Sequence, residues 1–101
     1  AVHCGPGVQF QGTEHITVYA SSQWAERAFC NKCGTHLYYK LLATDEYFVP
    51  AGVFDSTDFE IASQIYVDNK PNYYSFANQT PMLTEQQVVE QFAPPGGETA
   101  A

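Results

Sequence analysis

The strongest chemical signal in the sequence is the run Cys30-Asn-Lys-Cys33-Gly34. Two cysteines separated by two residues in a turn can direct both thiolates to one point, and the glycine that follows can adopt a positive φ. Backbone N–H groups of such a turn can point at the sulfurs and stabilise their negative charge. Because this arrangement is one half of a tetrahedral zinc site, we predict that Cys30 and Cys33 are ligands of Zn²⁺.

Two other interpretations of the cysteine pair stay open. A redox dithiol gains reactivity when its first cysteine begins a helix, but the residues after Cys33 favour a strand. Two reduced cysteines could also simply pack in a core, because free Cys is commonly buried.

Zinc needs four ligands, and the pair supplies two. The remaining candidates are Cys4, His3, His15 and His36. If residues 3 and 4 lie in a strand, their side chains point to opposite faces, which predicts a strand cysteine and an exposed histidine. His36 is expected to point away from the turn, on a sheet face. The sequence therefore shows an incomplete metal site.

Composition narrows the classes of partner. The 101 residues indicate one domain at most, and 11 Asp and Glu against 4 Lys and Arg give a net charge of −7. Four scattered cations cannot form the basic patch that nucleic acid or an anionic membrane surface requires, so we expect neither partner. No apolar run reaches the roughly 18 residues of a membrane span. An odd number of cysteines, two of them close together, favours a reducing compartment, and we expect a cytoplasmic protein.

The elements that must position the cysteines are mostly strands. A β-branched run predicts a strand over residues 15–20, and residues 24–42 are typical of a hairpin with the cysteines at its tip. Further strands are expected at 8–11, at 61–67 and at 46–53, the last an edge or bulged strand because Pro50 interrupts it. Thr84 and Gln87 fit a capping box, which predicts one helix over residues 85–92.

These elements predict a mainly β fold of antiparallel sheets built from hairpins, with one short C-terminal helix. We expect one domain over residues 1–93 and a flexible tail over 94–101. Aromatic residues are expected to pack the sheets rather than line a cleft. This applies to Trp24, Tyr38, Tyr66, Tyr73, Tyr74 and Phe76. Because Lys70 directly precedes Pro71, we expect it to lie in an exposed turn.

Two segments carry a family resemblance. YASSQWAERAFCNKCGTHLYY, residues 19–39, resembles the cysteine-turn region of the glutathione-dependent formaldehyde-activating enzyme family, which includes centromere protein V. SQIYVDNKPNYYSFA, residues 63–77, is similar to the closing motif of that family. The resemblance runs from about residue 2 to about residue 92. It implies a β-tent of twisted antiparallel sheets and a carbon–sulfur lyase that acts on the adduct of glutathione and formaldehyde.

The resemblance also implies which metal site each cysteine belongs to. Cys30 and Cys33 match the second half of a four-cysteine structural zinc site, whereas Cys4 matches no ligand. The first half of that site, and the three-cysteine set for the catalytic zinc, belong to an N-terminal third that we expect to be missing here. Whether this chain is an enzyme therefore stays open. The family implies a carbon–sulfur lyase, but we expect this chain alone to be inactive.

The alternative is a non-catalytic, zinc-supported β domain that acts as an oligomerising or binding module. The parent protein would bind a glutathione adduct or another small thiol adduct.

The strands expected at 15–20 and 61–67 carry no charged residue. Because an uncharged edge strand is a template for another chain, we expect a homo-oligomer.

Overall fold

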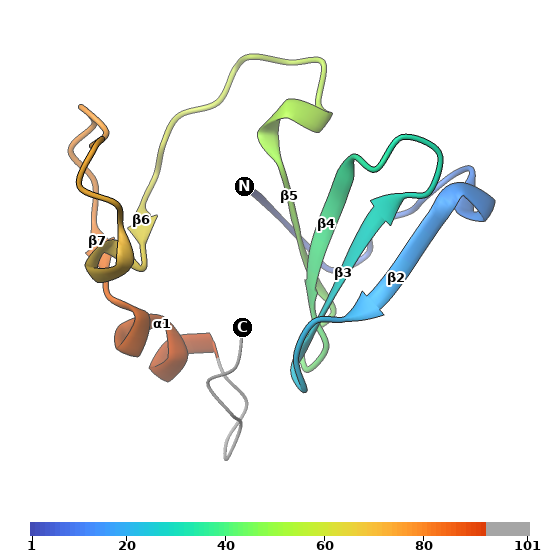
Figure 1. The fold of residues 1–101 in the computed structure, drawn as a ribbon, viewed down its shortest axis with the longest axis horizontal. Coiled ribbons are helices and arrows are strands. Elements are labelled where there is room, and N and C mark those ends of the chain that lie inside the picture. Colours follow the sequence, from blue (N-terminus) through green and yellow to red (C-terminus); the bar gives the residue numbers. More distant parts are fainter. Residues whose placement is uncertain (93–101) are drawn as a thin grey trace. The chain divides into compact units, whose positions relative to one another are not determined.

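The computed structural model describes residues 1–92, which fall into two compact units (Figure 1). The first unit is Ala1–Thr57, and the described part of the second is residues 58–92. The flexible tail expected at 94–101 lies outside the described residues. Among the described residues, none of the helices is both long and apolar enough to cross a membrane.

The first unit is built on a five-stranded antiparallel sheet, so the expected mainly β class is confirmed. In chain order the strands are β1 (Val2–Gly5), β2 (Ile16–Ala20), β3 (Ala25–Cys30), β4 (His36–Leu41) and β5 (Glu46–Val49). They lie side by side in the order β1-β5-β4-β3-β2. Two short 3₁₀ helices flank them, η1 (Thr13–His15) before β2 and η2 (Ala51–Val53) after β5.

The core of this unit forms around one small and two larger side chains. Ala28, Tyr38 and Val49 are buried together, one each from β3, β4 and β5. Cys4, Phe10, Ile16, Leu37 and Tyr47 pack against them. Ala28 and Tyr38 face each other in the register of the central hairpin, so their side chains share one face of the sheet. Trp24 is also buried, so Trp24 and Tyr38 have the packing role expected for aromatics.

Two strand predictions in this unit were wrong. Residues 8–11 form no strand, since they lie between Gly7 and Gly12, whose φ angles of 83° and 66° turn the chain. Residues 46–53 form a strand only as far as Val49, because Pro50 has no N–H to continue the ladder. That strand, β5, is also not an edge, because it pairs with β1 on one side and β4 on the other.

Residues 58–92, the described part of the second unit, contain little regular structure. β6 (Gln64–Ile65) pairs with β7 (Met82–Leu83) in parallel, and η3 (Val67–Asn69) lies between them in sequence. Of the strand predicted over 61–67, only two residues form a strand. It ends there because Tyr66 adopts a left-handed conformation with φ 54°. The expected antiparallel pairing holds for the large sheet only.

The helix α1 (Glu85–Phe92) begins and ends at the predicted residues. The Gln87 N–H donates to the Thr84 hydroxyl oxygen at 3.3 Å, and the Thr84 N–H donates to the Gln87 side-chain oxygen at 2.8 Å. This reciprocal pair is the capping box that the sequence indicated. The Glu85 N–H also donates to a carboxylate oxygen of Asp68 at 3.0 Å, which holds the helix start against η3.

Candidate metal centre

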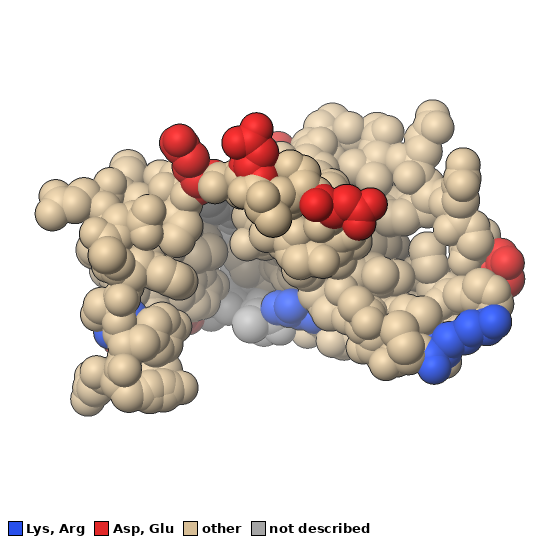
Figure 2. All heavy atoms as spheres, turned by 90° about the horizontal axis from the view of Figure 1, so that it is seen from above, with Lys and Arg blue, Asp and Glu red and all other residues tan. Residues whose placement is uncertain are grey.

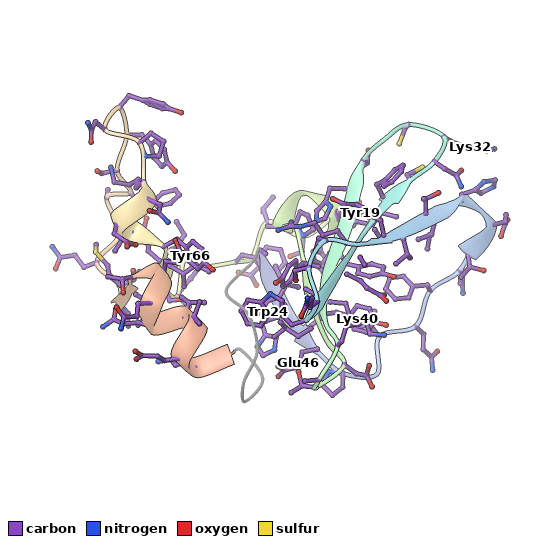
Figure 3. All side chains as sticks on the ribbon, turned by 60° about the horizontal axis from the view of Figure 1, so that its bottom comes forward. Tyr19, Trp24, Lys32, Lys40, Glu46 and Tyr66 are labelled. Carbon is purple, nitrogen blue, oxygen red and sulfur yellow. The ribbon has the colours of Figure 1, made fainter. Side chains whose placement is uncertain are left out.

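Cys30 and Cys33 lie at the tip of the β3–β4 hairpin, as the sequence predicted. Cys30 is the last residue of β3, and β4 begins at His36. The Cys30 N–H donates to the Thr35 carbonyl at 2.8 Å, and the Gly34 N–H donates to the Cys30 carbonyl at 2.7 Å. Gly34 has φ 81°, a conformation that a residue with a side chain rarely adopts, so the glycine is what allows this tight turn. Lys32 projects from the same tip (Figure 3).

The turn stabilises the thiolate form of Cys33. Its sulfur lies 3.1 Å from the Thr35 hydroxyl oxygen. Hydrogen bonds from that hydroxyl, then from the Thr35 backbone and then from the Cys30 side chain lower the pKa of the exposed Cys33 thiol. Both cysteines are free thiols. The surroundings of Cys33 therefore favour the charge state that a metal ligand needs.

Asn31 fixes the hairpin tip to the segment before it. Its backbone N–H donates to the His15 carbonyl at 2.9 Å. Its side-chain amide donates to the Glu14 carbonyl at 3.2 Å and to the Thr17 hydroxyl at 3.4 Å. These three bonds hold the tip against η1 and the start of β2, so the cysteine pair sits on a supported loop.

Two of the other candidate ligands, His3 and Cys4, make contacts away from the hairpin tip. His3 lies on β1, where its ring stacks on Phe48 with centroids 4.6 Å apart and its Nε2 lies 3.2 Å from a Glu46 carboxylate oxygen. Cys4 packs against the core on the other face, as expected for neighbours in a strand. Within residues 1–92, no three His, Cys, Asp or Glu side chains are placed to hold one metal ion together. The described residues therefore offer two ligands at the hairpin tip.

A cavity of about 480 Å³ adjoins Cys30, and sequence reasoning missed it. Its walls are mostly apolar, with Phe10, Leu37 and Val49 among them, and Cys30, Cys4 and His15 also line it. The lining comes from segments far apart in the chain, so no local pattern could have indicated it. The cavity places an apolar, ligand-sized space beside one of the two predicted metal ligands.

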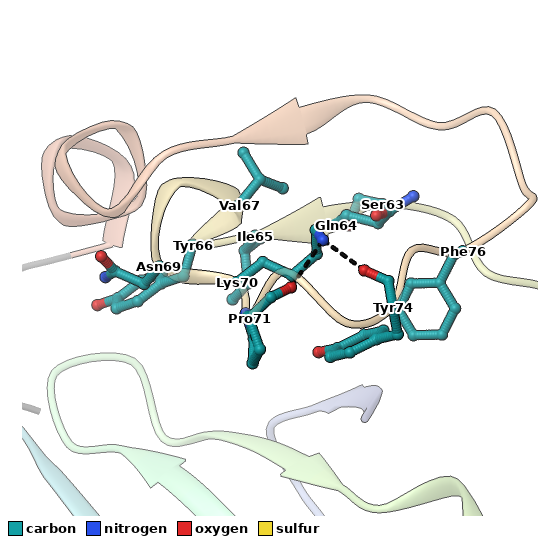
Figure 4. Close-up of a pocket in the computed structure, with 10 residues that line it drawn as sticks. All are labelled: Ser63, Gln64, Ile65, Tyr66, Val67, Asn69, Lys70, Pro71, Tyr74 and Phe76. Atoms are coloured by element: carbon teal, nitrogen blue, oxygen red, sulfur yellow. Dashed lines mark hydrogen bonds between the residues drawn. The ribbon is translucent and has the colours of Figure 1, made fainter.

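A second pocket, of about 350 Å³, lies within the second unit, and sequence reasoning missed it too (Figure 4). Tyr66, Tyr74 and Phe76 line it, so these aromatics do not pack the sheets as expected. Tyr73 is 78% exposed, which also contradicts the expected packing role. Lys70, expected to be exposed, is half-buried in this pocket.

Lys and Arg side chains are sparse in this chain, 4 against 11 Asp and Glu. On the face shown in Figure 2, Lys and Arg side chains are scattered and form no continuous basic patch. In the first unit Lys40 pairs with Asp45 at 3.4 Å.

Comparisons with known proteins give one informative match. No family model matches the chain, and no solved structure matches it. An uncharacterized lyase from Schizosaccharomyces pombe is 36% identical to it over 92 residues. The alignment covers 89% of this chain and 67% of the relative. At this identity and coverage, the chain belongs to the same protein family as the Schizosaccharomyces pombe lyase.

Proposed function

We propose that the chain is a zinc-binding domain of a carbon–sulfur lyase that acts on the adduct of glutathione and formaldehyde. The relative named as a lyase supports the general class. The two sequence segments that resemble the formaldehyde-activating family support the specific reaction. The observation that carries the proposal is the hairpin tip, where two free thiols belong to one tight turn and the Cys33 sulfur lies 3.1 Å from the Thr35 hydroxyl oxygen.

The residues at the tip fit one half of a tetrahedral zinc site. Cys30 and Cys33 would hold the metal, and zinc bound there would cross-link the hairpin tip to the element that supplies the other two ligands. Thr35 stabilises the thiolate of Cys33, and Asn31 keeps the loop in place. Because residues 1–92 supply only two ligands at this point, water or a neighbouring chain should complete the tetrahedral site.

The same ligand count favours a second candidate function. A domain with only a structural half-site would serve as a zinc-supported oligomerising or binding module rather than as a catalyst. We expect this chain alone to give no turnover of the glutathione–formaldehyde adduct. An assay with added zinc tests this expectation, and saturable, chelator-sensitive turnover would overturn it.

Cobalt substitution tests the metal site itself. Co²⁺ added to the reduced protein should produce thiolate-to-cobalt charge-transfer absorption in the near ultraviolet. The absorption should disappear in the Cys30→Ser and Cys33→Ser variants and persist in Cys4→Ser, which removes a thiol away from the tip. Equal absorption in all four proteins would refute the assignment.

A further inference from the structure

The pocket of the second unit combines an apolar wall with one cation. It is formed by β6, η3 and the loop that follows, and its volume of about 350 Å³ lies in the range of small-molecule sites, about 300 to 1,000 Å³. Ile65, Val67 and Pro71 contribute aliphatic surface. The rings of Tyr74 and Phe76 meet edge to face with centroids 5.9 Å apart. The wall can therefore accept the apolar part of a small ligand.

Lys70 is the cation, and its ammonium is held in place by the protein. Its Nζ donates to the Pro71 carbonyl at 2.9 Å and to the Tyr74 carbonyl, as the dashed lines in Figure 4 show. It also lies 5.3 Å from the centroid of the Tyr74 ring. An ammonium has three donors, so two carbonyl partners leave one for a ligand. Among the described residues the ion pairs do not include Lys70, so no carboxylate neutralises its charge.

The amide side chains in the lining are engaged elsewhere. Gln64 donates to the Asn78 carbonyl at 3.4 Å and to the Thr80 hydroxyl at 3.2 Å. Asn69 donates to the Glu85 carboxylate at 2.7 Å. Lys70 therefore supplies the charge that would orient a ligand in this pocket.

The surrounding charge limits the kind of ligand. Lys70 is the single Lys or Arg in residues 58–92, which also contain five acidic residues, Asp58, Glu60, Asp68, Glu85 and Glu90. Each further negative charge on a ligand adds repulsion from these carboxylates, so a ligand with one carboxylate for the one ammonium is favoured over a polyanion. A partly buried ammonium also forms a stronger hydrogen bond to a carboxylate than to a neutral acceptor.

The backbone of the pocket is set by a strained turn. Tyr66 is a non-glycine residue with φ 54° and ψ 35°, and this conformation ends β6 and starts η3. Such conformations cost free energy and are concentrated at ligand sites. In this pocket the turn brings the chain back so that Lys70 and Tyr74 line the same space as β6.

We propose that this pocket binds a small organic monocarboxylate, whose carboxylate accepts a hydrogen bond from Lys70 and whose apolar group packs against Tyr74 and Phe76. The proposal does not depend on the zinc site. It concerns a ligand that carries one negative charge next to a planar or aliphatic group.

Titration of the ¹⁵N-labelled full chain with phenylacetate and with its neutral isostere phenylacetamide tests the proposal. Phenylacetate should cause saturable shifts of backbone amides within residues 63–76. Phenylacetamide should bind about tenfold more weakly or worse, because it forms no charge-assisted bond with Lys70. Equal affinity for the two probes, or no saturable shift in this segment, would overturn the proposal. The unmodified protein alone is enough for this test.

Variants of the lysine then assign the effect to one residue. Lys70→Met keeps the aliphatic stem over Tyr74 but removes the charge, so it should abolish the preference for phenylacetate. Lys70→Arg should retain the preference. Lys32→Met is the matched control, because it makes the same change at the exposed hairpin tip. A preference that survives in Lys70→Met with an otherwise unchanged spectrum would also contradict the proposal.

Discussion

Thr35 is the residue that most directly sets the chemistry of the cysteine pair. Its hydroxyl lies 3.1 Å from the Cys33 sulfur and is the largest of the influences that lower the pKa of that thiol. Because its pKa is lowered, Cys33 loses its proton at a lower pH than an ordinary cysteine does. In the metal-free protein, Cys33 should therefore be alkylated at a pH where an unperturbed thiol, with a pKa of about 8.5, is still mostly protonated.

Replacing the hydroxyl tests this cause. Thr35→Val keeps the β-branched shape but removes the hydrogen bond, so the pH midpoint of Cys33 alkylation should move upward. The rate of iodoacetamide modification at Cys33, followed by peptide mass spectrometry across a pH series, measures the shift. Thr44→Val, in the turn between β4 and β5, should leave the midpoint where it is. The idea fails if Thr35→Val leaves the midpoint unchanged.

At the scale of elements, the capping box makes a quantitative prediction for α1. Thr84→Ala removes the hydroxyl that accepts from the Gln87 N–H, and loss of such a cap costs about 1 kcal/mol. Protection of the Val88 and Val89 amides from hydrogen exchange should therefore fall about fivefold. Thr57→Ala, outside the helix, is the control. Unchanged protection in Thr84→Ala would mean that packing alone sets the helix start.

Local patterns predicted the elements that depend on neighbours in the chain. The capping box and the Cys-x-x-Cys-Gly turn fall within a few residues, and both are present as expected. The pairing of β1 could not be predicted, because its partner β5 is far along the chain and His3 pairs with Phe48. The end of β6 was missed because Tyr66 turns left-handed there, and Tyr is a residue type that favours strands.

The candidate site also has one part that local sequence could predict and one part that it could not. The turn that carries Cys30 and Cys33 has a local signature, so its position at a hairpin tip could be predicted. The neighbouring cavity needs Phe10, Leu37 and Val49 to meet, and only the folded sheet brings them together. The half-burial of Lys70 likewise depends on carbonyls that the loop places around its ammonium.

At the scale of the whole molecule, the free edge of the large sheet predicts self-association. β2 is the last strand of the sheet on one side, it carries no charge, and Val18 and Tyr19 are 45% and 48% exposed. The net charge of −7 opposes association but is screened beyond about 10 Å at ordinary salt. Edge pairing acts at contact, so we expect a dimer or larger homo-oligomer.

Sedimentation at micromolar concentration measures this association. Val18→Lys places a charge on the edge strand and should shift the protein toward monomer. Leu42→Lys adds the same charge at another exposed position and should leave the association intact. A clean monomer of 11.2 kDa for the unmodified chain would refute the prediction.

Binding of zinc by Cys30 and Cys33 can be measured as the zinc content of the purified, reduced protein. Elemental analysis should find zinc with the unmodified chain and with Cys4→Ser, whose thiol packs against the core rather than at the tip. Zinc should be lost from Cys30→Ser and from Cys33→Ser. If the protein holds no zinc after dialysis against a zinc-containing buffer, or keeps its zinc in both tip variants, then Cys30 and Cys33 are not zinc ligands.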